Sequence, residues 1–358
     1  MKNGNIKVLL VDDSPLVLAL LIRILSLPGS GIDVVGTAAD GVEALQKIPK
    51  LDPQVVCTDI LMPRMDGLEL IRNIMATYPR PILVLSVVAE QKEGENHSLE
   101  LLEAGAIDVM PKPQDSLYGN LPEVGKDLIA KIRLLSGVKT FTRYSRSTIK
   151  ESTPSVIPQS TPRKKNLSVF IPPYTQVFAI GASIGGPHGL YTILSNLPSQ
   201  LSVPVICFQH ISKGFTQNLV DWLNIDSSLP VRIAQEGERL APGIVYFPAD
   251  NKHLVLDTKG RATTATGGSG MLSHRPSITL GFNSIAQYYG RSAVGILLTG
   301  MGADGADGLL NIRKAGGVTI AEDESSCVVF GMPKVAADIG AAQHVLSLSQ
   351  IAKLLENI

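Results

Sequence analysis

The sequence predicts an α/β protein built from two parallel-sheet domains. The length of 358 residues exceeds what one hydrophobic core usually serves. Short β-branched runs alternate with helix-period segments on both sides of a break in the pattern. The break is rich in Pro, Ser and Thr and carries many basic residues, as flexible linkers do. We therefore expect an N-terminal (βα)5 domain at 1–135, a flexible basic linker at 136–172, and a C-terminal doubly wound, mostly parallel-sheet domain at 173–358.

The first half contains five strand-like runs, each followed by a helix-like segment. Val8-Leu9-Leu10-Val11 is apolar throughout, which is typical of a strand covered on both faces. Five βα units predict one open parallel sheet with helices on both sides. The expected strands are Ile6–Val11, Ile32–Thr37, Gln54–Thr58, Pro81–Ser86 and Ile107–Met110, and the expected helices lie near 14–27, 40–49, 66–77, 90–104 and 121–135.

The same alternation resumes after the linker. The stretch Thr263–Gly270 is rich in Gly, Thr and Ser and is expected to be a loop. The expected strands are Val177–Ile180, Val203–Phe208, Val231–Ala234, Ile244–Phe247, His253–Leu256, Ala293–Leu298, Val318–Ala321 and His344–Leu346, and the expected helices lie near 186–196, 214–223, 276–289, 304–315, 332–339 and 348–356.

Composition excludes several classes of function. Lys plus Arg and Asp plus Glu balance at 32 each, so nothing favours nucleic acid or an anionic membrane as partner. No apolar stretch reaches the 18 or so residues of a membrane span, and the N-terminus lacks signal-peptide features. The three cysteines lack metal-ligand spacing. We expect a cytoplasmic protein without nucleic-acid binding or membrane insertion. The basic linker is interpreted as a solvated tether, with contact to acidic surfaces or nucleic acid as the alternative.

Acidic residues follow the strands of the first domain at one rim. Asp12 and Asp13 follow the first strand, Asp59 the third, Ser86 ends the fourth and Lys112 follows the fifth. The carboxyl ends of parallel strands meet at one edge, where ligands bind. Clustered carboxylates repel one another, and Mg²⁺ relieves this repulsion with oxygen ligands. The grouping suits phosphoryl transfer to a carboxylate, with a cation and a lysine neutralising the phosphoryl oxygens.

Three motifs carry a resemblance to a known family across residues 5–135. Val11-Asp12-Asp13-Ser14, the run Thr58–Gly67 and Lys112-Pro113 resemble a response-regulator receiver domain. The resemblance implies a histidine kinase as phosphodonor. It implies Asp59 as phosphoacceptor, Asp12, Asp13, Asp59 and the Leu61 carbonyl as Mg²⁺ ligands, and Ser86 and Lys112 as switch residues. Val109 occupies the position where this family often has a rotating Phe or Tyr.

The second half begins with a candidate nucleophile. Gly181-Ala182-Ser183-Ile184-Gly185 fits the pattern G-x-S-x-G, in which small neighbours allow a sharp strand-to-helix turn. A helix starting after Pro187 would direct its amide dipoles at this turn and favour developing negative charge. Such glycine-rich turns also hold phosphates, although Ser183 stands where a dinucleotide-binding G-x-G-x-x-G needs its second glycine.

A base and an acid follow other strands at the same rim. A serine hydroxyl needs a base, and His210 ends a buried strand, whereas His188 is expected to face solvent. Asp304 follows the apolar strand Val294–Leu298 and is expected to orient the imidazole; it also suits the N-cap of the next helix. The glycines of this loop would let the Met301 amide donate to an oxyanion.

These runs carry a second resemblance over residues 175–356. With Ser273–Ser277 and Cys327–Pro333, they resemble the catalytic domain of chemotaxis protein-glutamate methylesterases, the CheB family. The resemblance implies Ser183 as nucleophile, His210 as base, Asp304 as orienting acid and Met301 as oxyanion donor, with no cofactor for ester hydrolysis. It implies methylated chemoreceptor helices as substrate, and some members also deamidate glutamine.

Two departures from the family pattern stand beside the nucleophile and the base. Ile184 replaces the usual Thr after the serine, so a hydroxyl that could orient substrate or water is lost, and Ile211-Ser212-Lys213-Gly214 replaces the usual Met-Pro start. Two alternatives stay open. One is a phosphorylation-gated scaffold with an inactive esterase domain, and the other is a DNA-binding regulator that uses the basic linker.

Overall fold

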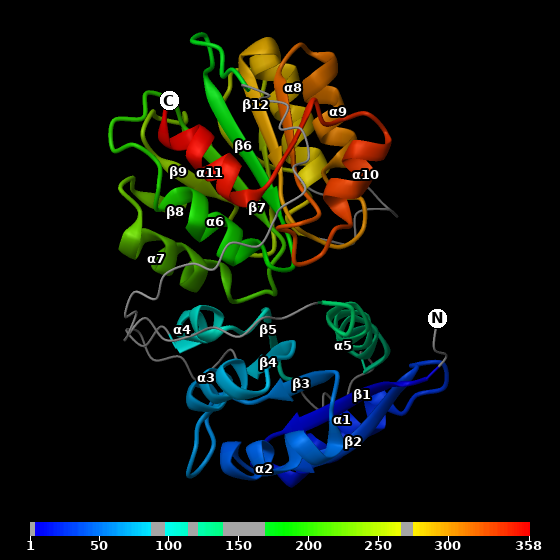
Figure 1. The fold of residues 1–358 in the computed structure, drawn as a ribbon. Helices are drawn as coiled ribbons and strands as arrows, with labels where there is room; N and C mark the ends of the chain where they lie inside the picture. Colours follow the sequence, from blue (N-terminus) through cyan, green and yellow to red (C-terminus); the bar gives the residue numbers. More distant parts are fainter. Residues whose placement is uncertain (1–3, 87–96, 114–120, 139–168, 266–274) are drawn as a thin grey trace, which may run out of the picture.

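The computed structural model describes residues 4–86, 97–113, 121–138, 169–265 and 275–358. They form two α/β domains, one above the other in Figure 1. Most of the expected linker, and residues 90–96 and 266–274, lie outside the described residues. No helix among those described is both long and apolar enough to cross a membrane.

The N-terminal domain is a five-stranded parallel sheet with the order β2-β1-β3-β4-β5. Side-chain caps fix where its helices begin, because Ser14, Asp40 and Asp66 accept backbone amides of the first turns of α1, α2 and α3. The expected elements are confirmed within one to three residues where the structure describes them. They are β1 (Ile6–Val11), α1 (Pro15–Leu25), β2 (Ile32–Ala38), α2 (Gly41–Leu51), β3 (Val55–Thr58), α3 (Gly67–Thr77), β4 (Ile82–Ser86), α4 (His97–Ala104), β5 (Asp108–Pro111) and α5 (Leu121–Leu135).

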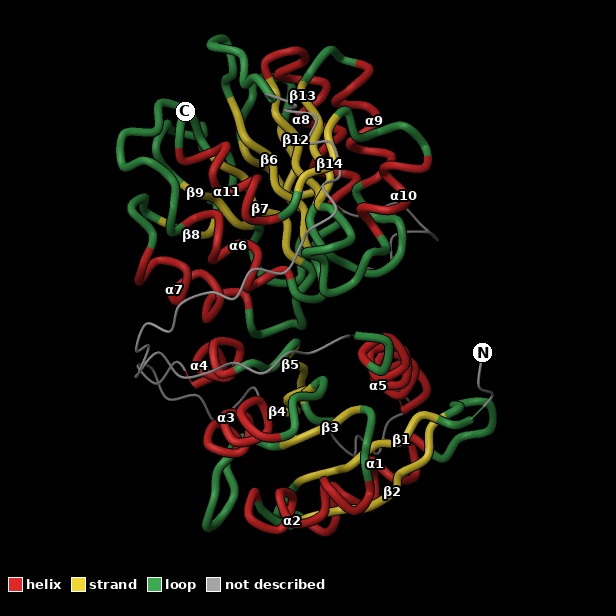
Figure 2. Tube along the Cα trace, viewed as in Figure 1, coloured by secondary structure: helices red, strands yellow, loops and turns green. Residues whose placement is uncertain are grey.

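The C-terminal domain is a seven-stranded parallel sheet with the order β14-β13-β12-β6-β7-β9-β8. Helices cover both of its faces, as the tube in Figure 2 shows. Its elements are β6 (Val177–Ala182), α6 (Gly186–Leu194), β7 (Val205–Gln209), α7 (Thr216–Asp226), β8 (Val231–Ile233), β9 (Val245–Phe247), β10 (His253–Leu256), β11 (Ala262–Ala265), α8 (Ile278–Tyr289), η2 (Gly290–Ser292), β12 (Ala293–Leu297), α9 (Ala306–Lys314), β13 (Val318–Glu322), α10 (Met332–Asp338), β14 (His344–Leu346) and α11 (Leu348–Glu356).

The expectation of a loop from Thr263 to Gly270 is wrong for its first residues. Ala262–Ala265 forms β11, which pairs antiparallel with β10 in a hairpin outside the main sheet. β-branched Thr263 and Thr264 suit this pairing, and Glu236 accepts hydrogen bonds from both of their hydroxyls.

The strand order of each sheet reverses direction at one point. In the C-terminal sheet, β7, β8 and β9 lie on one side of β6, and β12, β13 and β14 lie on its other side. The N-terminal sheet reverses in the same way between β1 and β3. Ligands bind in crevices at such points, at the carboxyl ends of the strands.

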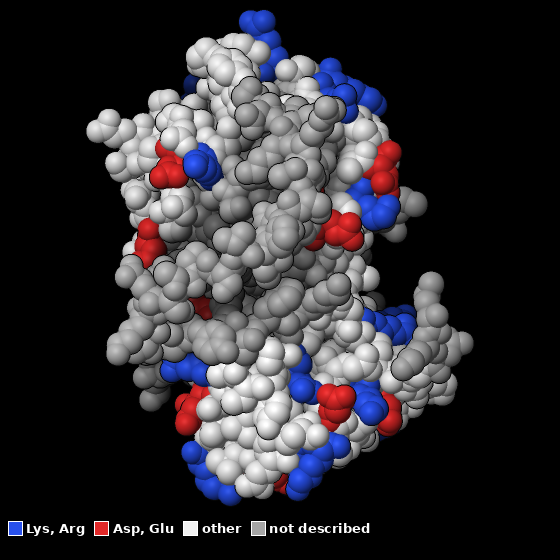
Figure 3. Space-filling model, in the orientation of Figure 1, with Lys and Arg blue, Asp and Glu red and all other residues white. Residues whose placement is uncertain are grey.

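The two domains contact each other through α4 and β5 of the first domain. Helix α4 packs against α6 and α7, and Glu103 Oε1 accepts a hydrogen bond of 3.0 Å from Trp222 Nε1. Phe215, 3% exposed, is buried in the same apolar cluster as Leu101 and Val109 of the N-terminal domain. On the face of the molecule shown in Figure 3, basic and acidic side chains of the described residues are interspersed.

Candidate active site and phosphorylation site

Ser183 stands on a tight turn between β6 and α6. Its amide donates to Thr299 O at 3.0 Å, and its carbonyl accepts from Gly186 N at 2.8 Å and from Gln209 Nε2 at 2.8 Å. Gly185 has a φ of 77°, and a Cβ there would lie 2.5 Å from Val328 Cγ2. The turn therefore requires glycine, as the sequence pattern predicts.

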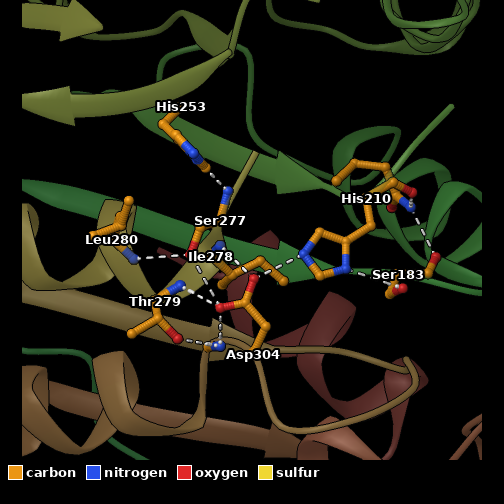
Figure 4. Close-up of polar contacts among 10 residues, drawn as sticks. Ser183, His210, His253, Ser277, Ile278, Thr279, Leu280 and Asp304 are labelled. Carbon is orange, nitrogen blue, oxygen red and sulfur yellow. Dashed lines mark hydrogen bonds and ion pairs between the residues drawn. The ribbon is translucent and has the colours of Figure 1, made fainter. Parts of the chain in front are cut away.

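His210 lies between Ser183 and Asp304. Its Nδ1 is 3.3 Å from Ser183 Oγ, and its Nε2 is 2.9 Å from Asp304 Oδ2 (Figure 4). The carboxylate can only accept, so the neutral imidazole carries its proton on Nε2 and presents a lone pair on Nδ1 to the hydroxyl. The structure thus brings together the three residues that the sequence places after β6, β7 and β12.

Asp304 is seated on the first turn of α8. Its carboxylate accepts the amides of Ile278 and Thr279, both at 2.9 Å, and the hydroxyl of Ser277 at 3.2 Å. Burial alone would raise the pKa of Asp304, but hydrogen bonds from His210 and Thr279 outweigh it and hold the pKa well below its usual range. Asp304 is therefore a stable anion beside the imidazole. The alternative role as N-cap of α9 is wrong, because Gly305 holds that position without a side-chain cap.

The loop after β12 lies against Ser183. A Cβ on Gly300 would lie 2.5 Å from Ser183 Cβ, so only glycine permits this approach. The Met301 amide donates no backbone hydrogen bond within the described residues. Thr299 fixes the loop, since its amide donates to buried Glu322 at 2.8 Å and its hydroxyl donates to Ile184 O at 3.0 Å. Among the described residues, the Met301 amide is thus left out of the backbone hydrogen bonds, and it directly follows Gly300, which packs against Ser183.

The N-terminal domain holds an acidic pocket at its sheet crevice. One carboxylate oxygen from each of Asp12, Asp13 and Asp59 lies within 4.8 Å of the others. Lys112 Nζ is 2.8 Å from Asp12 and 2.8 Å from Asp59. Burial alone would lower the pKa of Lys112, but these two carboxylates outweigh it and raise it, which keeps the lysine charged. The Leu61 carbonyl accepts no backbone hydrogen bond in the described part of the chain.

This donor set fits a magnesium ion. Carboxylates are hard oxygen ligands, and the exposed Asp13 leaves a side open to water. Burial raises the pKa of Asp59, while nearby Lys112 opposes the shift. Ser86 ends β4 with 6% exposure, and its carbonyl accepts the Lys112 amide at 2.8 Å. The predicted switch residues therefore lie on adjacent strands.

Residues of the N-terminal domain close the space around the triad. Ile184, 8% exposed, is buried in one apolar cluster with Leu128 and other side chains of the N-terminal domain. A cavity of about 20 Å³, room for one water, lies beside His210, with Val109 and Phe215 among its lining residues. Ser183 itself is 8% exposed. Among the described residues, Ser183 is therefore largely shielded from solvent while the domains are docked this way.

Comparison with known proteins agrees with this architecture. The CheB methylesterase family model matches residues 178–355, and the response regulator receiver domain model matches residues 8–118. A protein-glutamate methylesterase/protein-glutamine glutaminase of Geobacter metallireducens is 39% identical over 99% of both chains. The chain belongs to the CheB methylesterase family.

Further CheB-family relatives cover both domains. A protein-glutamate methylesterase/protein-glutamine glutaminase of Hahella chejuensis is 41% identical over 98% of both chains. Among solved structures, the Thermotoga maritima CheB catalytic domain is 35% identical over 51% of this chain and 99% of its own, with a TM-score of 0.49. The response regulator domain of Thermotoga maritima CheB is 36% identical over 38% of this chain and 98% of its own, with a TM-score of 0.33.

Sequence reasoning missed the groups that support this CheB-family triad. Ser277 carries a visible signal, because a serine before an apolar helical run is a typical N-cap. Gln209, which bonds the carbonyls of both Ser183 and His210 at 2.8 Å, carries no such signal. Thr279, His253 and Glu322 also lack one, since their roles depend on contacts between segments distant in the sequence.

Proposed function

We propose that this chain is a phosphorylation-activated protein-glutamate methylesterase of the cytoplasm. It hydrolyses γ-glutamyl methyl esters on chemoreceptor helices, and releases methanol and a glutamate carboxylate. Glutamine deamidation at the same positions follows from the same chemistry, because amide and ester share a tetrahedral intermediate. The observation that carries the proposal is His210 in contact with both Ser183 Oγ at 3.3 Å and Asp304 at 2.9 Å.

The proposed mechanism gives each residue of the esterase site a step. Ser183 Oγ attacks the ester carbonyl carbon as Nδ1 of His210 takes its proton, and the Met301 amide donates to the resulting oxyanion. Asp304 stabilises the imidazolium through Nε2. The intermediate collapses when the carbon–oxygen bond to methoxide breaks and Nδ1 returns the proton, so methanol leaves. Water then attacks the acyl-serine with His210 as base, which restores Ser183.

The acidic pocket supplies the control. A histidine kinase is the proposed donor of the phosphoryl group that Asp59 accepts. Asp12, Asp13, Asp59 and the Leu61 carbonyl would hold Mg²⁺, which neutralises phosphoryl oxygens when bound. Lys112 and Ser86 would contact the remaining oxygens. Because Lys112 follows β5, and β5 lies at the domain contact, their movement would loosen the N-terminal domain from the triad.

The test is methanol release from methylated receptor by the full chain, with a small phosphodonor and Mg²⁺ present. Ser183→Ala should abolish release, and Asp304→Asn should reduce it by roughly 10⁴-fold, as loss of an orienting acid does in a serine triad. Circular dichroism of both variants controls for folding. Near-normal turnover by Ser183→Ala would contradict the proposal and favour the inactive-scaffold alternative for this domain.

A further inference from the structure

His253 is a buried histidine that the proposed reaction does not use. It opens β10 and is 3% exposed. Its Nδ1 accepts a hydrogen bond of 2.9 Å from the backbone amide of Ser277 (Figure 4). Burial and the positive charge of Arg275 lower the pKa of His253, although Asp304 opposes them, so the neutral ring with an acceptor on Nδ1 is favoured.

The other ring nitrogen of His253 is buried without a hydrogen bond among the described residues. Because Nδ1 accepts, the neutral ring carries its proton on Nε2. A buried donor without a hydrogen-bond partner is destabilising. An apolar residue of similar size would avoid this cost, so the value of His253 to the protein lies in the acceptor at Nδ1.

The bond from Ser277 leads directly to Asp304. Ser277 is the N-cap of α8, where its hydroxyl accepts Leu280 N at 3.3 Å and lies 3.2 Å from Asp304 Oδ1. The next two amides, of Ile278 and Thr279, donate to the carboxylate of Asp304 at 2.9 Å each. A shift of the Ser277 peptide would therefore move every donor that α8 offers to Asp304.

The β10–β11 hairpin supplies the anchor. It stands outside the seven-stranded sheet, yet β10 makes extensive contact with α8. Leu254 and Leu256 of β10 are buried with Ile278 and Phe282 of α8 in one apolar cluster. The apolar packing holds the helix against the hairpin, and the single directional bond from Ser277 to His253 sets where the helix begins.

We infer that His253 is a positioning residue for the triad, acting through Ser277 and the first turn of α8 to seat Asp304 against His210. The inference rests on the proposed roles of His210 and Asp304. It assigns the hairpin a task in catalysis, although no atom of the hairpin touches Ser183, His210 or Asp304 in the hydrogen bonds described above.

Two amide substitutions test separately the roles of the two ring nitrogens of His253. In His253→Asn, the side-chain oxygen can take the place of Nδ1, whereas in His253→Gln the amide reaches the place of Nε2. Both keep a polar group of similar size. With the full chain, phosphodonor and Mg²⁺, we expect His253→Gln to lower kcat by about 10- to 100-fold at unchanged KM, because small misplacements of a catalytic group cost that much. The His253→Asn variant should keep most of the wild-type activity. Equal activity of His253→Asn and His253→Gln would overturn the inference.

A double-mutant cycle shows whether the effect passes through Asp304. In an Asp304→Ala background, His253→Gln should lower kcat less than twofold further, because the group that it positions is gone. A purely structural defect would lower kcat by the same factor in both backgrounds, and that result would also overturn the inference. Thermal unfolding of each variant gives the folding control.

A second readout keeps the inference separate from the proposed substrate. A fluorophosphonate reports Ser183 reactivity without a receptor, since Oγ forms a bond to phosphorus and fluoride leaves. Failure of the wild type to release methanol, with normal labelling, would contradict the proposed function alone. In that case, slow labelling of the His253→Gln variant with near-normal labelling of the His253→Asn variant would still support the positioning role.

Discussion

At the scale of single residues, Ile184 has surroundings that its sequence position did not predict. In the sequence it replaces the usual Thr after Ser183, which indicated a lost hydroxyl. The structure buries it among side chains of the N-terminal domain, 8% exposed, in the cluster that contains Leu128 and Ile132. We therefore expect Ile184 to stabilise the docked arrangement of the domains.

Ile184→Thr and Ile184→Val test these two roles. Thr and Val have similar shapes. Ile184→Val removes one buried methyl, which costs about 0.5–1.5 kcal/mol, and Ile184→Thr also places a hydroxyl among apolar side chains, which adds to the cost. If Ile184 holds the domains together, Ile184→Val should raise methanol release by the unphosphorylated chain about 2- to 10-fold, Ile184→Thr should raise it at least as much, and both should leave the phosphorylated rate unchanged. If a hydroxyl matters instead, Thr alone should raise the phosphorylated rate.

The contact among Ser183, His210 and Asp304 could be predicted because parallel strands end at one rim. Ser183, His210 and Asp304 each follow a strand, and the three strands are neighbours in the sheet. The hydrogen-bond partners of Asp304 could not be predicted, because α8, which begins 26 residues earlier in the chain, supplies the amides. The contact of His253 with Ser277 could not be predicted either, because it also joins segments distant in the sequence.

At the scale of elements, the apolar periodicity located almost every helix and strand. It failed at β11, where two adjacent threonines before a Gly-rich stretch give too weak a signal for a two-stranded hairpin. Apolar periodicity also cannot predict contacts between domains. Val109 lacks the large ring often found at its position, and Phe215 of the C-terminal domain is buried in the same cluster. No local pattern indicates that pairing.

The contact between α4 and α7 predicts an effect on basal activity. Trp222 Nε1 donates to Glu103 Oε1 at 3.0 Å. Glu103→Ala removes the acceptor and leaves the indole N–H unpaired in the docked state, at a cost of about 1 kcal/mol or more. Methanol release without phosphodonor should rise about fivefold or more, by a matching shift toward the undocked state. Glu103→Gln retains an acceptor and should stay near wild type; a rise of the same size in Gln would argue against the hydrogen bond.

At the scale of the whole molecule, two chemically independent sites share one regulated surface. The acidic pocket lies at the crevice of one sheet and the triad at the crevice of the other. Between them lie β5, α4 and the apolar clusters that contain Ile184, next to Ser183, and Phe215, which lines a small cavity beside His210. Phosphorylation replaces the single negative charge of the Asp59 carboxylate with a phosphoryl group that carries about two, and Lys112 and Ser86 are placed to meet it. Activity should therefore depend on how strongly this charge weakens domain docking.

Phosphodonor with Mg²⁺ should raise the rate of the full chain, and chelation of Mg²⁺ or Asp59→Asn should block the rise. The loosened Glu103→Ala variant should gain proportionally less from phosphodonor, because part of its population is already undocked and both changes act on one equilibrium.

The fragment 173–358, if it folds alone, should release methanol at least as fast as the phosphorylated chain, and phosphodonor should not change its rate. A fragment that is folded but no faster than the unphosphorylated chain would rule out inhibition by docking. Full phosphodonor gain in Glu103→Ala would show that phosphorylation acts by a route other than this contact.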